Sequence, residues 1–181
     1  MELFEVIRAR QSVRAYQSRG IGEDQLNAIL SAADQSPSAG NLQAYQIILI
    51  REQPLIRELV KATYNQDFIA QAPIVLVFCA DTERSGAKYG DSGRRLFCVQ
   101  DATIATAYAQ LAATALGLAT CWVGAFEEEK VVGLLGLRRG LRPVAILPVG
   151  WPAESPPRTP RRNVDELVSE VRRPATESAH G

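Results

Sequence analysis

Residues 97–126, FCVQDATIATAYAQLAATALGLATCWVGAF, decide the fold of this chain. From Ala102 to Phe126 they carry no charged side chain, a length that could span a bilayer. The stretch is nevertheless rich in Ala and Thr, contains Gln110 and is interrupted by Gly117. We therefore expect a helix over residues 97–116, buried on most sides, and then a buried strand over residues 120–123. The alanines permit close helix–helix approach, either in the core or across a subunit boundary.

Apolar periodicity predicts further elements on both sides of this stretch. The expected strands are residues 45–50 (YQIILI), 74–79 (IVLVFC, covered on both faces) and 144–149. The expected helices are residues 3–10, 23 to about 35, 55–64, 127–135 and a short last helix that Asn163 and Glu166 would cap. The polar, glycine-containing segment 81–95 predicts a mobile excursion. Together these elements predict one sandwich domain of helices and strands.

The composition excludes several classes of protein. Among 181 residues, 20 basic side chains balance 20 acidic ones, which gives no general attraction to nucleic acid or to an anionic membrane. The N-terminus lacks the pattern of a signal peptide, and three widely spaced cysteines predict buried free thiols in a reducing compartment, so we expect a cytoplasmic protein. The single histidine, His180, lies next to the C-terminus, which argues against a Ser-His-Asp triad or a His-rich metal site.

Two basic clusters could bind a phosphate. In an extended segment, Arg10, Ser12 and Arg14 would share one face and offer two guanidinium groups and a hydroxyl to one anion. A second cluster, Arg158 to Arg162, could join them on the same phosphate. Each cluster taken alone is equally compatible with a solvated basic surface.

Two further segments could contact a heterocyclic ring. In the loop from Pro37 to Gln43, Gly40 allows close backbone approach, and the amides of Asn41 and Gln43 can donate and accept hydrogen bonds. In residues 121–126 (CWVGAF), a strand runs into a small-residue turn, whose backbone N–H groups could reach a ring nitrogen. A plain surface loop and core packing are the alternatives for these two segments.

Five segments, taken in order, resemble the FMN-dependent nitroreductase family. They are RQSVRAY at 10–16, SPSAGNLQAY at 36–45, APIVLVFCAD at 72–81, GLATCWVGAF at 117–126, and LPVGWPAE with the following Arg161 at 147–161. The resemblance covers roughly residues 1–170 and implies an α+β sandwich with a central mixed or antiparallel sheet flanked by helices. It also implies an intertwined homodimer with FMN at the subunit interface, and it leaves residues 171–181 as a flexible tail.

The resemblance implies the following cofactor contacts. Phosphate and flavin-edge contacts fall on Arg10, Gln11, Ser12, Arg14 and Arg161; a loop from the partner subunit on Pro37, Ser38, Asn41 and Gln43; ring contacts on Asn65 and Gln66; and a backbone strip on Val123, Gly124 and Ala125. No side-chain acid or base is needed, and Arg14 would tune the flavin. Ala44-Tyr45 departs from a common Pro-Trp pair, and Ala125 from a second glycine, which leaves the substrate class open.

The implied activity is a ping-pong oxidoreductase. NADH or NADPH would reduce FMN and leave, and an electron-poor small molecule (a nitroaromatic, quinone or flavin) would then take the electrons. Two alternatives stay open: specialised flavin chemistry on the same fold, such as dehalogenation or flavin fragmentation, and a non-catalytic FMN-binding or storage protein. Neither a nucleic acid nor a membrane is expected as a partner.

Overall fold

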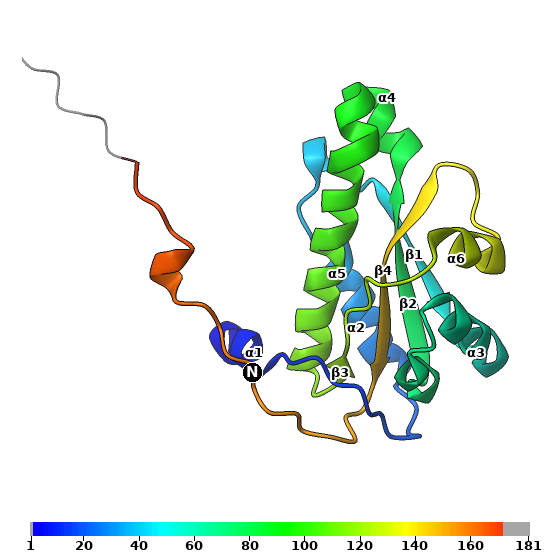
Figure 1. Ribbon diagram of the computed structural model, residues 1–181, viewed down its shortest axis with the longest axis vertical. Coiled ribbons are helices and arrows are strands. Elements are labelled where there is room, and N and C mark those ends of the chain that lie inside the picture. The colour runs from blue at the N-terminus through cyan, green and yellow to red at the C-terminus, as the bar shows by residue number, and fades with distance from the viewer. Residues whose placement is uncertain (1, 172–181) are drawn as a thin grey trace, which may run out of the picture.

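The computed structural model describes residues 2–171, so that His180 and all of the predicted tail except Val171 lie outside the described residues. The described chain is built around a four-stranded sheet with the order β1-β2-β4-β3 (Figure 1). The strands are β1 (Tyr45–Ile50), β2 (Ile74–Asp81), β3 (Ala119–Thr120) and β4 (Leu141–Gly150). Each neighbouring pair is antiparallel, and a lone parallel bridge joins Ser12 to Thr120.

Helices cover both faces of this sheet, as the unbroken apolar run of β2 predicts. Alternate residues of a strand point to opposite faces, and every residue of β2 is buried. Val75 and Val77 pack with α3 (Gln53–Ala62) and α6 (Glu128–Leu135), whereas Leu76 and Phe78 pack with α2 (Glu23–Asp34) and α5 (Cys98–Ala115). Figure 1 shows these two helical layers on either side of the strands. The predicted α+β sandwich is confirmed.

The long helix α5 has one buried side and one exposed side. Ala102, Ala105, Ala109 and Ala113 have no exposed surface and bring the helix close to its neighbours. The opposite side is open in the single chain, and Tyr108 there is 40% exposed. The expected helix and strand are therefore present, although the strand is shorter than predicted and continues only as an isolated bridge between Val123 and Ile146. No helix among residues 2–171 is both long and apolar enough to cross a bilayer.

The segment 81–95, for which the sequence predicts a mobile excursion, is helical. It forms α4 (Thr82–Ser92) and then one π-helical turn (Gly93–Phe97) that leads directly into α5. The Asp81 carboxylate starts α4 by accepting the Arg84 N–H at 3.0 Å, and it also accepts a guanidinium hydrogen bond from Arg138 at 2.6 Å. Gly93 permits close packing: a β-carbon there would lie 2.4 Å from the Ser85 carbonyl oxygen. The glycine is therefore needed for packing, not for a loop.

The first and last described segments of the chain lie outside the two helical layers, and the last one projects away from them (Figure 1). Helix α1 (Leu3–Ala9) lies beside the C-terminal end of α5 (Figure 1), and Leu3 and Phe4 are largely exposed. The chain after β4 is extended, and the predicted last helix is a single 3-10 turn (Val164–Glu166), started by Asn163. Exposed apolar side chains follow at Leu167 and Val168.

All three cysteines are free and buried, as predicted. Burial raises the pKa of the Cys79 thiol, which lies inside the sheet on β2, to about 12.

Candidate cofactor site

The segment from Arg10 to Tyr16 is held extended along the end of the sheet. The Val13 N–H donates to the Thr120 carbonyl at 3.1 Å, and Tyr16 forms a bridge with Pro152. The side chains of Val13 and Tyr16 are buried, and they pack with Ala72 and Ala119, which holds the segment against the domain. Arg14 is exposed between these two buried residues.

The two basic clusters meet in one pocket of about 680 Å³, which we call the arginine pocket. The predicted residues that line it are Arg10, Gln11, Ser12, Arg14, Arg158 and Arg161; Ile7, Arg8, Pro156, Pro157 and Thr159 complete it. Five guanidinium-bearing residues and no carboxylate line the pocket. Arg162 does not line it, because its guanidinium bonds to the Glu166 carboxylate at 3.2 Å.

Burial and the arginines also determine the electrostatics of the residues next to the arginine pocket. Burial raises the pKa of the Cys121 thiol, and the nearby Arg14 guanidinium opposes that shift. The Glu154 carboxylate accepts the backbone N–H of Arg14 and so helps to hold the extended segment from Arg10 to Tyr16 in place. The Arg14 guanidinium carbon lies 5.9 Å from the centre of the Phe68 ring, within cation–π range.

Next to the sheet, the predicted ring contacts come together only in part. The Gln66 side chain donates to the Ala125 carbonyl at 3.1 Å, so residues far apart in sequence meet here. Asn65 has a left-handed backbone (φ 58°), as does the exposed Tyr64 before it. Val123 uses both backbone groups on Ile146 and has a buried side chain. Within residues 2–171, the N–H groups of Gly124 and Ala125 have no hydrogen-bond acceptor, which leaves them free for a ligand.

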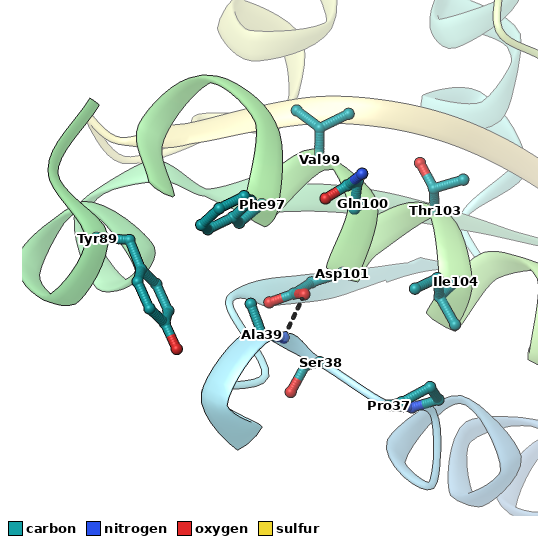
Figure 2. Close-up of a pocket in the computed structure, with 10 residues that line it drawn as sticks. All are labelled: Pro37, Ser38, Ala39, Tyr89, Phe97, Val99, Gln100, Asp101, Thr103 and Ile104. Atoms are coloured by element: carbon teal, nitrogen blue, oxygen red, sulfur yellow. Dashed lines mark hydrogen bonds between the residues drawn. The ribbon is translucent and has the colours of Figure 1, made fainter. Parts of the chain in front are cut away.

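The loop of residues 36–43 lies elsewhere, at the other end of α5. Pro37 and Ser38 line a second, mainly apolar pocket of about 630 Å³ together with Tyr89, Phe97 and the first turns of α5 (Figure 2). Within the loop, the Gln43 side chain donates to the Asn41 side-chain oxygen at 2.6 Å. Gln43 therefore supports the loop internally, and the arginine pocket shares no lining residue with this pocket.

Comparison with known proteins identifies the family. The model of the "Nitroreductase family" matches residues 7–63 and 54–151 of the chain. This chain belongs to the nitroreductase family. The resemblance seen in the five sequence segments is thereby confirmed.

Relatives of this nitroreductase-family chain include a nitroreductase and an FMN reductase. An oxygen-insensitive NADPH nitroreductase of Salmonella typhimurium is 32% identical over 173 residues, covering 92% of this chain and 72% of the relative. An NAD(P)H-dependent FMN reductase of Bacillus subtilis is 28% identical, covering 94% of this chain and 78% of the relative. The solved structure of B. megaterium NfrA2 superposes with a TM-score of 0.87 at 28% identity, covering 97% and 77% of the two chains.

Sequence reasoning missed several residues of the site in this nitroreductase-family protein. Glu154 lies 140 positions from Arg14, and no local pattern links the two. Phe68, beneath the Arg14 guanidinium, looks like any other core aromatic in the sequence. Pro156 and Pro157 did carry a signal, since consecutive prolines predict the extended chain that forms one wall of the pocket.

Proposed function

We propose that this chain is an FMN-dependent oxidoreductase that transfers electrons from NADH or NADPH to a small, electron-poor acceptor. The observation that carries the proposal is the arginine pocket, in which two basic clusters about 150 residues apart converge. The names of its relatives, an NADPH nitroreductase and an FMN reductase, support the same activity. Nitroaromatics, quinones and free flavins are the acceptor classes that fit this reading.

The donor set of the pocket fits the phosphate of FMN. A phosphate monoester carries a charge of about −1.5 to −2 near neutral pH and offers three strong acceptor oxygens. Arg10 and Arg161 supply planar guanidinium donors and Ser12 a hydroxyl, and Arg14 adds a third positive charge to the pocket. In the described part of the chain these three arginines form no ion pair, so binding a phosphate would break no internal one.

The neighbouring strip fits the flavin ring. Gly124 and Ala125 would donate backbone hydrogen bonds, and Gln66 already fixes the position of Ala125. Arg14 would place a permanent positive charge beside the ring and favour its electron-rich form. Bound FMN supplies the two-electron redox chemistry, and the protein supplies orientation and charge.

A homodimer would complete the site. Helix α5 has 18 residues, about 27 Å at 1.5 Å per residue. The loop of residues 36–43 lies at its N-terminal end and the arginine pocket at its C-terminal end. Two copies that pack their α5 helices antiparallel around a two-fold axis would bring the loop of each to the arginine pocket of the other. The exposed side of α5 and the exposed apolar residues Phe4 and Leu167 would then be covered.

The visible spectrum of the purified protein tests the proposal, before and after anaerobic addition of NADH or NADPH. We expect yellow protein that bleaches, and we expect the double variant Arg10→Ala/Arg161→Ala to be colourless. Arg51→Ala serves as the matched control, because Arg51 is paired with Glu23 outside the pocket. Yellow protein that neither nucleotide bleaches would contradict the electron-transfer role. Colourless wild-type protein that takes up no added FMN would contradict the whole proposal.

A further inference from the structure

A buried carboxylate ties the loop of residues 36–43 to α5. Asp101 lies in the first turn of this helix and is only 2% exposed. One of its oxygens accepts the Ala39 N–H at 2.9 Å, as Figure 2 shows, and the other accepts the Ala44 N–H at 3.3 Å. A single side chain therefore holds the loop at two points, at Ala39 inside it and at Ala44 directly after it.

The loop between these two attachment points has a demanding backbone. Gly40, Asn41 and Gln43 all have positive φ angles, at 56°, 57° and 42°. Non-glycine residues adopt this region only at a cost in free energy, so the surroundings must hold them there. The Ser38 hydroxyl accepts the Gln43 N–H at 2.9 Å inside the loop.

Helix α4 closes over the same loop. A β-carbon at Gly40 would lie 2.2 Å from the Tyr89 hydroxyl, so the loop backbone passes directly beneath that side chain. The ring of Tyr89 is in turn held edge-on against Phe97 at 5.2 Å between ring centres. The loop thus contacts Asp101 of α5 and Tyr89 of α4, and it is also bonded internally through Ser38. Of these contacts, the one with Asp101 involves a carboxylate.

We propose that Asp101 is a positioning residue for the flavin site: it fixes the shape of the loop that this chain presents to the FMN of its partner subunit. The inference rests on the proposed function and extends it. A loop that contributes contacts to a second chain gains affinity when its bound shape is already populated before assembly. Asp101 provides that preorganisation without contacting FMN itself.

The carboxylate is specifically suited to this task. Both of its oxygens accept hydrogen bonds, and both face a backbone donor. An asparagine has nearly the same shape but only one acceptor oxygen, so its NH₂ group would face the other N–H, donor against donor. Asp101→Asn should therefore release one end of the loop while leaving the packing around it nearly unchanged.

A control for general stability lies on the same helix. The Thr106 hydroxyl, fully buried, donates to the Ala102 carbonyl at 2.7 Å and does not touch the loop. Thr106→Val also removes one buried hydrogen bond at almost constant shape. The two variants should lose similar thermal stability, so that any difference between them in flavin binding comes from the loop.

The experiment titrates the full-length wild type and both variants with FMN and with riboflavin, and it measures amide hydrogen exchange of residues 38–44 without flavin. We expect Asp101→Asn to weaken both flavins about tenfold, because the loop would reach the ring and not the phosphate, and to speed exchange in the loop. Thr106→Val should change neither affinity by more than about twofold. If Asp101→Asn does not fold, Asp101→Ser takes its place with the same expectations.

The outcomes separate this inference from the proposed function. Wild-type protein that binds FMN, with Asp101→Asn within about twofold of it or with unchanged exchange in the loop, would overturn the positioning role alone. Loss of affinity in Thr106→Val equal to that in Asp101→Asn would overturn it as well. Wild-type protein that takes up no FMN would overturn the proposed function, and the positioning role with it.

Discussion

Replacing Arg161 by alanine removes one guanidinium from the arginine pocket and little else. Arg161 is exposed, and in the described part of the chain it takes part in no ion pair. Surface substitutions of this kind usually change the free energy of unfolding by less than about 0.5 kcal/mol. Any large effect of Arg161→Ala must therefore come from the ligand.

The size of that effect follows from the contact that would be lost. A hydrogen bond to a charged group contributes about 1.5–3 kcal/mol. At 1.4 kcal/mol per factor of ten, the Kd for FMN should rise about 10-fold to 150-fold. Riboflavin carries the same ring without the phosphate, so its Kd should stay within about twofold of the wild-type value.

The assay is a titration of each flavin, followed by its own fluorescence, at constant ionic strength because contacts between charges weaken with salt. Arg162→Ala is the matched control, since Arg162 lies next in the chain but pairs with Glu166 and not with the pocket. Equal weakening of FMN and riboflavin by Arg161→Ala, or equal effects of the two substitutions, would refute the assignment of Arg161 to the phosphate.

Three further predictions concern stability and assembly. In urea denaturation, Gly93→Ala should lower the free energy of unfolding by about 2 kcal/mol or more, because the added β-carbon would meet backbone atoms of Ser85. The control Gly133→Ala, whose β-carbon would enter open space on α6, should raise the free energy of unfolding by about 0.5–1 kcal/mol. The fold keeps the Cys79 thiol neutral, with a pKa of about 12, so the thiol's contribution to the free energy of unfolding is complete below pH 9 and is lost as the pH rises towards 12. Between pH 9 and 10.5 we expect the free energy of unfolding of the wild type to fall by about 1.5 kcal/mol more than that of Cys79→Ala. Parallel pH curves for the two proteins would contradict this prediction. Tyr108→Glu should shift the protein to monomer in light scattering and weaken FMN binding as well. The control Arg57→Glu, on the exposed surface of α3, should change neither. An intact Tyr108→Glu dimer would exclude the exposed side of α5 as the interface.

The sequence predicts the sandwich well because its signals are local. The run IVLVFC is apolar at every position, and the structure buries every residue of β2 on one face or the other. The segment YQIILI matches β1 at both ends, from Tyr45 to Ile50. Both runs are only six residues long and rich in β-branched side chains, and these two local features favour a strand over a buried helix.

Segment 81–95 shows where local signals fail. Its glycines and polar residues are typical of a loop, yet Gly93 lies where α4 and the next turn approach within backbone contact. The N-terminal cap depends on Asp81, and the Asp81 carboxylate is also bonded to Arg138, 57 positions later. A glycine that serves close packing and a carboxylate that serves a distant arginine look, in sequence alone, the same as loop residues.

The sequence predicts part of the candidate site, but it does not predict which subunit would supply each residue. Alternation in an extended segment places Arg10, Ser12 and Arg14 on one face, and chemistry alone assigns them to an anion. No such rule tells which of two subunits would supply a residue, because the separation of two residues in sequence does not give their distance in the structure. The loop of residues 36–43 and the arginine pocket lie at opposite ends of α5, and the proposed homodimer is the arrangement that would bring them to one ligand. In that proposed dimer, the hydrogen bonds of the buried Asp101 to Ala39 and Ala44 would stiffen, within one subunit, the loop that the other subunit would use.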